Sequence, residues 1–549
     1  MKRTLILIYV LIACIMTEAQ PVATPSLNDE IRAVWLTTIG GIDWPRTYAT
    51  SPATIEQQKR ELTRMLDRLK LIRINTVLLQ TRIRGTVIYP SSLEPWDGCM
   101  SGQPGRSPGY DPLRFAIDEC HKRGMELHAW VVTLPLGKWN GAGCRNMRNK
   151  YPKLIRRIGE DGFLNPEQPQ TGDVIASVCE EIVRKYDVDG IHLDYIRYPD
   201  GWKIKVGRSI GREHITSIVR KIHTAVKSVR RNIKLSCSPI GKYEDLSRYS
   251  SRGWNAYMGV CQDAQGWLRT GLMDQLYPMM YFAGNNFYPF AIDWKEQSFG
   301  RHVISGLGVY MLHPRERNWP MAEVQRQLNV VREIGMGHCY FRAKFLLDNV
   351  KGVYDYVRWH DRYPALIPPM TWAQSLAPTA PKALVVERRA EGDRLSWQEA
   401  EDRSDGPYLI YNIYASDSYP VDVTKAENLI ATRYLWKNIS IPKTQRQWYY
   451  AVTAQDRYGN EGPAIQEEST HSQDCNVSSM LPNDGRKLRV IVATDAKTLQ
   501  IATLQGKTIK TCMNEQQIDI STLPEGIYQL KSVHKKGITH RLGFFVVRR

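Results

Sequence analysis

Hydrophobic and polar residues follow two alternating patterns between about residues 30 and 360. Short apolar runs predict β-strands, and between them apolar residues recur every three or four positions, which predicts helices. The clearest predicted helices are residues 53–71, 112–123, 171–186, 214–229 and 321–334. The predicted strands are residues 31–38, 74–81, 125–133, 190–198, 233–239, 275–282, 303–309 and 337–345. Eight strands that alternate with helices predict an α/β fold, a (β/α)8 TIM barrel, over residues 28–362.

A doubly wound open sheet is the alternative, but no glycine-rich phosphate loop follows any predicted strand. Two loops after predicted strands, residues 82–111 and 134–169, are long and rich in Gly, Pro, Asn and Trp. In a TIM barrel such loops gather at the carboxyl ends of the strands, where active sites are built. The sequence therefore predicts the functional site at that end.

Two small all-β sandwich domains are predicted after the barrel. Residues 363–380 are rich in Pro, Ala and Thr and predict a linker, and short alternating strands return over residues 381–470. Trp397, the segments 411–414 and 449–454, and the Asp456 turn that follows resemble a fibronectin type III domain. The resemblance implies that Tyr450 is its corner tyrosine.

The second β-domain is predicted over residues 483–549. Its segments 504–507, 518–521 and 523–530 resemble the C-terminal sorting domain of the Bacteroidetes type IX secretion system. The resemblance implies that secretion machinery reads this domain and that the protein reaches the cell surface or the medium. An ordinary β-sandwich accessory domain is the alternative interpretation.

The first 19 residues have the pattern of a signal peptide. Lys2 and Arg3 precede an apolar run over residues 5–16, and cleavage is predicted after Ala19. The run is too short to span a bilayer. The alternative is a lipobox that ends at Cys14, which would anchor the protein as a lipoprotein. Both interpretations predict a secreted or outer-membrane, cell-surface protein.

Charge, aromatic content and cysteine spacing limit which ligands and which covalent links the chain is expected to have. The chain of 549 residues has a net charge of +18, which favours anionic partners, but it has no run of five Lys or Arg and no nucleic-acid motif. The 15 Trp and 28 Tyr suit either sugar-binding clefts or a large core. No CxxC pair occurs, so no zinc site is expected. Cys99 and Cys144, both in glycine-rich loops, are candidates for a disulfide in an oxidising compartment.

The sharpest motif covers residues 188–199, at the fourth strand. Side chains alternate along a strand, so His192 and Asp194 share one face. If that face is the barrel interior, the Asp194 carboxylate lies in the cleft, where it can attack an anomeric carbon or stabilise an oxocarbenium ion. The alternative is a structural carboxylate that pairs with Arg197 or a loop amide. His192 lies deeper and is interpreted as a hydrogen-bonded residue of the interior.

The barrel resembles the bacterial glycosyl hydrolase-like 10 family. The segments that carry this resemblance are residues 32–38, 43–45, 75–82, 89–96, 110–113, 122–130, 164–166, 188–199, 238–241 and 273–281. The resemblance implies a TIM-barrel glycosidase, and some members are believed to cut peptidoglycan glycan strands stripped of their peptides. Three departures bear on substrate choice rather than on fold. Residues 131–133 replace an Asn-Pro stretch, Tyr195 replaces a second acid, and Met279 replaces a Gln.

A glycosidase normally needs a second carboxyl group. The candidates are Asp263, Glu244, Asp245 and Asp274. Asp263 is preferred and Glu244 comes next. Glu244, Asp245 and Asp263 follow the fifth strand, whereas Asp274 precedes the sixth strand and is interpreted as structural. An N-acetyl sugar could instead supply its own nucleophile. The residues expected to bind substrate by hydrogen bonds or ring stacking are Asp43, Trp44, Arg82, Trp96, His128, Trp130, Asn165, Arg197 and Tyr281.

The patterns predict a secreted, monomeric protein without metal or cofactor. The family resemblance implies that it is a glycoside hydrolase that cleaves a bacterial cell-wall or related polysaccharide by paired-carboxylate chemistry. A non-catalytic glycan-binding surface protein on a barrel scaffold is the alternative. A metal-dependent hydrolase ranks last, because the first strand lacks a His-x-His pair and no compact His/Asp cluster is seen.

Overall fold

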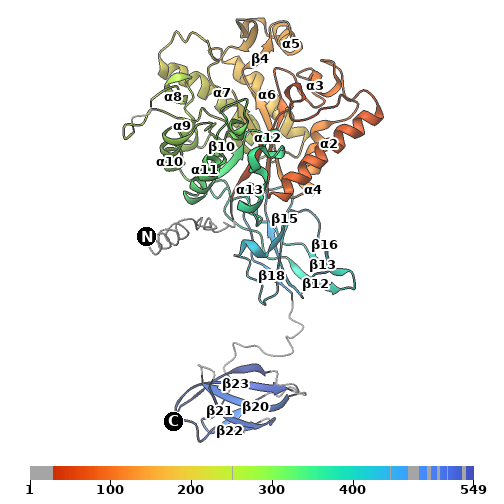
Figure 1. Ribbon diagram of the computed structural model, residues 1–549, viewed down its shortest axis with the longest axis vertical. Helices are drawn as coiled ribbons and strands as arrows, with labels where there is room; N and C mark the ends of the chain where they lie inside the picture. The colour runs from red at the N-terminus through yellow and green to blue at the C-terminus, as the bar shows by residue number, and fades with distance from the viewer. Residues whose placement is uncertain are drawn as a thin grey trace, which may run out of the picture. The chain divides into compact units, whose positions relative to one another are not determined.

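The computed structural model describes residues 29–249, 252–445, 447–467, 481, 483–490, 496–503, 507–515, 517–534 and 539–548. The predicted signal peptide and Cys14 lie outside these residues. The chain divides into two compact units, Met1–Gln466 and Glu467–Arg549 (Figure 1). None of the helices in the described part of the chain is long and apolar enough to cross a lipid bilayer.

Unit 1 contains a closed parallel barrel whose strands follow the order β1-β11-β10-β9-β8-β7-β3-β2. The strands are β1 (Arg32–Leu36), β2 (Thr76–Arg82), β3 (Glu126–Val132), β7 (Gly190–Asp194), β8 (Lys234–Cys237), β9 (Gln275–Leu276), β10 (His302–Leu307) and β11 (Gly337–Tyr340). Each lies within, or one residue from, a predicted strand. The prediction of a TIM barrel is therefore confirmed.

Helices surround the barrel and bury one face against it (Figure 1). The longer ones are α2 (Pro52–Leu71), α4 (Pro112–Lys122), α5 (Ala142–Lys150), α6 (Gln170–Lys185), α7 (Arg208–Val229), α9 (Ala264–Arg269), α10 (Tyr288–Glu296), α11 (Met321–Glu333) and α13 (Val353–His360). Short helices are α3 (Gly98–Ser101), α8 (Ala256–Gly259) and α12 (Ala343–Leu347). In α6 the buried residues Val174, Val178 and Ile182 recur every four positions, which gives the helix its apolar face.

The long loop after β3 folds into a small antiparallel sheet at the carboxyl end of the barrel. Its strands are β4 (Pro135–Lys138), β5 (Ile155–Ile158) and β6 (Asp161–Leu164), in the order β4-β6-β5. Leu164 N donates to Leu134 O at 2.9 Å, which ties the far end of this sheet back to the end of β3. The sheet thus forms one wall above the ends of β3 and β7.

The middle β-domain, residues 382–466, has two antiparallel sheets. One contains β12 (Lys382–Arg388), β13 (Gly392–Gln398) and β16 (Asn438–Pro442). The other contains β15 (Leu429–Tyr434), β14 (Ile410–Ser416), β17 (Tyr449–Gln455) and β18 (Ile465–Gln466). Trp397 packs between them, with its ring 5.4 Å from that of Tyr411, and Tyr450 donates to Asp393 at 2.8 Å. Two small sheets agree with the predicted all-β domain, and the fibronectin type III assignment stays a prediction.

The middle β-domain lies against the amino-terminal end of the barrel. Arg433 donates to Asp189 at 2.6 Å and to Glu126 at 3.0 Å, and Arg457 donates to Asp189 at 2.7 Å. The connecting segment 363–380 packs as well, because Leu366 and Met370 are buried and Leu366 O accepts from the backbone of Glu30. Barrel and middle β-domain are therefore joined by buried ion pairs at the end opposite the β4-β6-β5 sheet.

Unit 2 is also built from antiparallel strands. They form the pair β19 (Lys487–Arg489) and β22 (Gln517–Asp519), and a sheet of β21 (Thr508–Met513), β20 (Ala496–Thr503), β23 (Gly526–His534) and β24 (Thr539–Val547). Leu499, Ile501, Leu530 and Phe545 fill its core. This agrees with a small β-sandwich. Its role in sorting stays a prediction, and part of the motif, residues 504–506, lies outside the described residues.

The predicted disulfide between Cys99 and Cys144 is wrong, because the structure holds both as free, buried thiols. Cys99 lies in α3, whereas the Cys144 sulfur lies against Gly162 of β6. A Cβ at residue 162 would come within 2.3 Å of that sulfur. Each thiol therefore fills a gap in the apolar core, a common use of a free cysteine.

Candidate active site

Asp194 is the last residue of β7, at the carboxyl end of the barrel, and only 8% of its surface is exposed. Its Oδ1 accepts from Ser238 Oγ at 3.0 Å and from the Tyr195 amide at 2.8 Å. Its Oδ2 accepts from Trp130 Nε1 at 3.2 Å. Donors from β3, from the end of β8 and from its own chain thus hold the carboxylate in one orientation, as expected of a preorganised catalytic group.

The electrostatic environment of Asp194 favours its protonated form more than water does. Burial raises the pKa of this carboxyl group, and the hydrogen bond from Ser238 and the charge of Arg197 oppose the shift only in part. A carboxyl group with a raised pKa beside a cavity is the usual arrangement for a general acid or base. The raised pKa together with the position at the end of β7 makes Asp194 a functional candidate.

Tyr195 turns the chain sharply at the end of β7. Its φ of 54° lies in the left-handed region, which is uncommon for a bulky residue and recurs at functional sites. The turn leaves the phenol ring 36% exposed, and the Arg197 guanidinium lies 4.5 Å from the ring centroid. Arg197 also forms an ion pair with Asp200 at 3.0 Å. The segment after β7 therefore places a ring, a cation and a second carboxylate beside Asp194.

A cavity of about 270 Å³ opens over Asp194. Its walls come from the end of β7, from the segment after β2 and from the β4-β6-β5 sheet. The described residues that line it are Ile39, Gln80, Ile83, Arg84, Val132, Pro135, Gly137, Asp161, Phe163, Asp194, Tyr195 and Asp200. Among them, three carry carboxylates: Asp161, Asp194 and Asp200. The cavity therefore holds three carboxyl groups within one lining.

Asp161 and Asp200 were not predicted from the sequence. Asp161 begins β6, and its side chain is 41% exposed, with Lys138 Nζ 3.6 Å away. Asp200 follows β7 by six residues, and its side chain is 61% exposed. Two features of the sequence could have pointed to these residues. Asp161 lies in the long loop 134–169, whose composition suggested a functional loop, and Asp200 directly follows the motif that ends in Pro199.

The two predicted second carboxylates lie elsewhere. Asp263 caps α9, where it accepts from the Gly266 amide at 3.0 Å and from the Tyr243 hydroxyl at 2.7 Å. Glu244 is half-buried in the segment after β8. The described residues that line the Asp194 cavity include neither of them. The contacts of Asp263 are those of a helix-cap residue.

His192 lies beneath Asp194 in the barrel interior and is fully buried. Trp35 Nε1 donates to its Nε2 at 3.2 Å, so the proton lies on Nδ1, which is 3.0 Å from Ser236 Oγ. Burial lowers the pKa of His192 well below its usual value. The neutral ring links β1, β7 and β8 and supports the strand that carries Asp194.

Two of the predicted substrate-binding residues lie at Asp194, and a third shares its surroundings. Trp130 donates to the carboxylate, and Arg197 lies on the Tyr195 ring. Burial raises the pKa of Tyr281 well above its usual value, and the charge of Asp194 adds to the shift. The Tyr281 ring is stacked on that of Phe341 at 5.2 Å. These side chains support the floor and edge of the site.

The other predicted substrate-binding residues have structural contacts. Asp43 accepts from the Thr37 backbone and from Arg342, and Trp44 donates to Gln58 O in the core. Arg82 pairs with Glu94 and His128 with Glu126, all buried, and Asn165 accepts from the Glu167 amide. Trp96 is half-buried and forms a bridge with Val87. The described lining of the cavity does not include these six residues.

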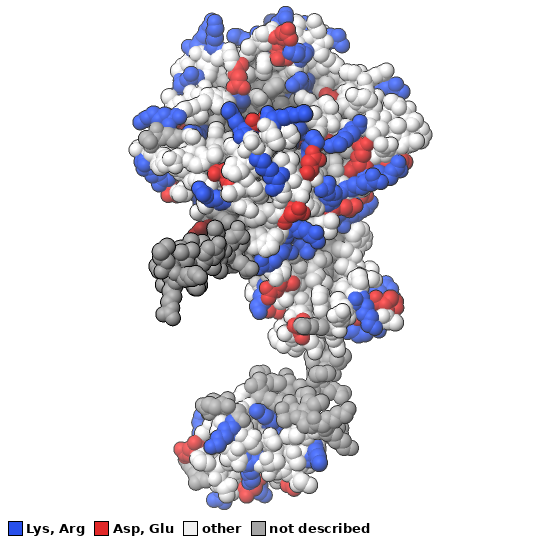
Figure 2. Space-filling model, in the orientation of Figure 1, with Lys and Arg blue, Asp and Glu red and all other residues white. Residues whose placement is uncertain are grey.

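The charged side chains of the visible face and the metal-ligating side chains of the described residues can be compared with the expectations from sequence. Figure 2 shows Lys and Arg spread over the visible face of the barrel, with acidic residues between them. Among the described residues, no group of three or more His, Cys, Asp or Glu side chains is placed to hold a metal ion.

Comparisons with known proteins give the family. The profile of the Glycosyl hydrolase-like 10 family matches residues 30–202 and 203–307. "Glycosyl hydrolase YngK" of Bacillus subtilis is 26% identical over 508 residues, which cover 83% of this chain and 97% of that protein. "Glycosyl hydrolase DigH" of Escherichia coli is 31% identical over 299 residues, which cover 48% of this chain and 68% of that protein. The glycoside hydrolase domain of PgaB (BpsB) from Bordetella bronchiseptica superposes with a TM-score of 0.43 at 16% identity, covering 60% of this chain and 98% of that domain. The chain belongs to the glycosyl hydrolase-like 10 family.

Proposed function

We propose that this protein is a glycoside hydrolase that cleaves glycosidic bonds in a bacterial cell-wall or related polysaccharide, with peptidoglycan glycan strands as the first candidate. One observation carries the proposal. Asp194 is buried and held by three donors at the carboxyl end of β7, in a cavity that also contains the carboxylates of Asp161 and Asp200. Acids at this end of a TIM barrel are the usual catalytic groups.

In this proposal Asp194 is the general acid. Burial raises the pKa of this carboxyl group, which favours the protonated form, and the fixed carboxyl group would deliver its proton to the glycosidic oxygen. As the bond breaks, the leaving sugar takes the proton, and the resulting Asp194 carboxylate is stabilised by Ser238, Trp130 and the Tyr195 amide. The Tyr195 and Phe163 rings offer faces for the apolar side of a sugar ring.

Asp161 is the preferred second carboxylate. Asp200 is engaged with both terminal nitrogens of Arg197, whereas the nearest cation to Asp161 is Lys138 at 3.6 Å. A solvated carboxylate of this kind can activate a water or attack the anomeric carbon. An N-acetyl sugar that supplies its own nucleophile is the other route, and Asp194 would then orient the acetamido group or act as the acid.

Export and assembly belong to the same proposal. Residues 1–19 would direct secretion, with Cys14 as the alternative lipid anchor, and unit 2 would be read by the secretion machinery. The enzyme would act as a monomer outside the cell on a polysaccharide substrate, without a cofactor.

The test is release of reducing ends from purified glycan strands stripped of their peptides. Wild type should release them, and Asp194→Asn should lose about a hundredfold to ten-thousandfold in rate, the usual contribution of a general acid. Asp348→Asn is the matched control, because this exposed carboxylate pairs with Lys344 at the surface. If wild type binds the strands and releases nothing, the barrel is a glycan-binding protein and the proposal is wrong.

A further inference from the structure

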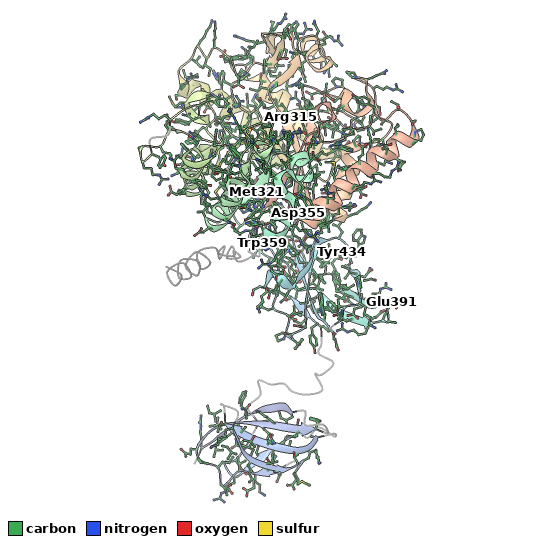
Figure 3. All side chains as sticks on the ribbon, viewed as in Figure 1. Arg315, Met321, Asp355, Trp359, Glu391 and Tyr434 are labelled. Carbon is green, nitrogen blue, oxygen red and sulfur yellow. The ribbon has the colours of Figure 1, made fainter. Side chains whose placement is uncertain are left out.

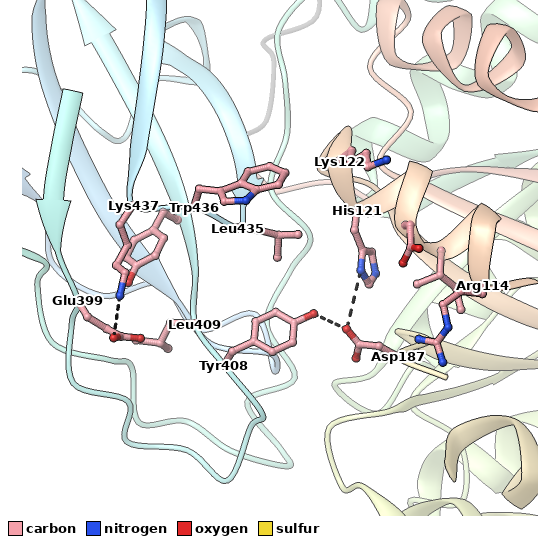
Figure 4. Close-up of a pocket in the computed structure, with 13 residues that line it drawn as sticks. Arg114, His121, Lys122, Asp187, Glu399, Tyr408, Leu409, Leu435, Trp436 and Lys437 are labelled. Carbon is pink, nitrogen blue, oxygen red and sulfur yellow. Dashed lines mark hydrogen bonds and ion pairs between the residues drawn. The ribbon is translucent and has the colours of Figure 1, made fainter. Parts of the chain in front are cut away.

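A second cavity, of about 600 Å³, lies where the middle β-domain meets the barrel (Figure 4). The barrel wall is α4 with Asp187, and the opposite wall is formed by Tyr408, Leu409 and the segment Leu435–Lys437. Asp187 precedes β7, whereas Asp194 ends it, so the two cavities lie at opposite ends of the barrel. This cavity is therefore separate from the candidate active site.

Buried contacts hold the two walls in place. The Tyr408 hydroxyl donates to Asp187 across the cavity floor, and Arg230 also pairs with Asp187 at 3.0 Å. Deeper in the interface, Arg433 and Arg457 both donate to Asp189. Because these contacts fix the middle β-domain on the barrel, the cavity exists before any ligand arrives. A preformed site at a domain interface is a common location for ligand binding.

Trp436 supplies an open aromatic face in this cavity. Its side chain is 48% exposed, and Tyr434 supports its ring edge-on at 5.2 Å between centroids. In Figure 4 the indole projects from the β-domain toward the wall that carries His121 and Lys122. A rigid indole offers a large apolar surface at a low cost in conformational entropy, and its face suits the C–H surface of a sugar ring.

The charges around Trp436 indicate the kind of ligand. The described lining has three basic side chains, Arg114, Lys122 and Lys437, and three acidic ones, Asp118, Asp187 and Glu399. Lys437 pairs with Glu399 at 3.0 Å, so opposite charges lie together rather than in separate patches. An anionic polymer would favour a basic lining, and an apolar ligand would favour an apolar one. A balanced set of donors and acceptors fits a neutral ligand rich in hydroxyl groups.

We propose that this cavity is a second glycan-binding site, in which one uncharged sugar ring of the polysaccharide chain stacks on Trp436. The inference rests on the proposed function for the class of ligand, but it does not require turnover. A chain bound here stays near the barrel while another segment of the polymer enters the Asp194 cavity, which raises the effective concentration of substrate. Loss of the site should therefore slow cleavage of polymer and leave cleavage of short oligosaccharides unchanged.

The test counts binding sites for hexa-N-acetylchitohexaose, a neutral probe, by calorimetry on the full chain. Asp194→Asn serves as the background, so that the probe is not cleaved. Adding Trp436→Ala should remove one binding site, from two to one if the Asp194 cavity binds this sugar and from one to none if it does not. Trp436→Phe should keep the site with weakened affinity, because the phenyl ring retains a stacking face.

Trp359→Ala is the matched control, because Trp359 is an exposed tryptophan of α13 that lies outside the described lining of the cavity (Figure 3). This variant should keep the full number of sites. An unchanged number of sites and unchanged affinity in Trp436→Ala would overturn the inference, as would the absence of saturable binding in the Asp194→Asn background. Failure of the proposed function would appear separately, as the absence of product from wild type.

Discussion

Removing either arginine that joins the middle β-domain to the barrel should destabilise unit 1 strongly. The side chains of Asp189, Arg433 and Arg457 are 1%, 8% and 2% exposed, so the ion pairs between them are shielded from water. Losing one partner of a buried pair typically costs about 3–5 kcal/mol. Asp189 would keep the other arginine and His121, which donates at 2.8 Å, so we expect about 3 kcal/mol for Arg433→Met or Arg457→Met. The double substitution should cost about 5 kcal/mol or more.

The assay is urea unfolding followed by tryptophan fluorescence. All 15 Trp precede residue 467, so the signal reports unit 1 alone. Arg220→Met is the control, because the pair between Arg220 and Glu213 is exposed at the surface and should contribute little. In an Asp189→Asn background, Arg457→Met should cost less than in wild type, since its buried partner has lost its charge. The reasoning would be refuted if Arg433→Met and Arg457→Met destabilised unit 1 no more than Arg220→Met.

Three further predictions concern the site and the barrel interior. Ser238→Ala removes a hydrogen bond that lowers the pKa of Asp194. In a plot of kcat/KM against pH, the decline on the alkaline side should therefore move to higher pH. An unchanged profile, or a shift to lower pH, would contradict the role of Asp194 as the acid. Asp161→Asn should lower kcat by at least about tenfold. Asp263→Ala, at the α9 cap, should cost about 1 kcal/mol of stability and leave kcat nearly unchanged. The reverse pattern in activity assays and urea titrations would show that the second carboxylate is misassigned. Burial alone would raise the pKa of Glu126, but the charges of Lys234 and Arg433 lower it to about 2. Its contribution to stability should therefore be complete above about pH 4.3, the pKa of an unfolded Glu, and be lost as the pH falls toward 2. Glu126→Gln should flatten that part of the curve of unfolding free energy against pH.

The barrel and the position of Asp194 could be predicted because local pattern determines them. Each barrel strand is a short apolar run separated from the next by a helix. Eight such repeats without a glycine-rich phosphate loop favour a closed barrel over an open doubly wound sheet. Along β7, the period of two places Asp194 on the inward face at the strand end, where the structure has it. The deeper position of His192 follows from the same alternation.

The second carboxylate that we propose, Asp161, depends on how a long loop folds, and the sequence does not specify this. Asp161 reaches the cavity because the segment after β3 folds into the β4-β6-β5 sheet. This folding depends on contacts between residues that are far apart along the chain. An aspartate in a loop can be a helix N-cap instead of a catalytic group. Asp263 is such a cap, because it accepts a hydrogen bond from the amide of Gly266, three residues later. The buried ion-pair partners of Asp189 could not be predicted from the sequence either, because Arg433 lies 244 residues away along the chain.

The most direct test of the central claim is cleavage of peptide-stripped glycan strands in water enriched in oxygen-18, with the products analysed by mass spectrometry. Hydrolysis catalysed through Asp194 predicts one heavy oxygen at each new reducing end with wild type, and release of these products at least about a hundredfold more slowly with Asp194→Asn. Unlabelled products from wild type, or labelled products from Asp194→Asn at the wild-type rate, would contradict the account.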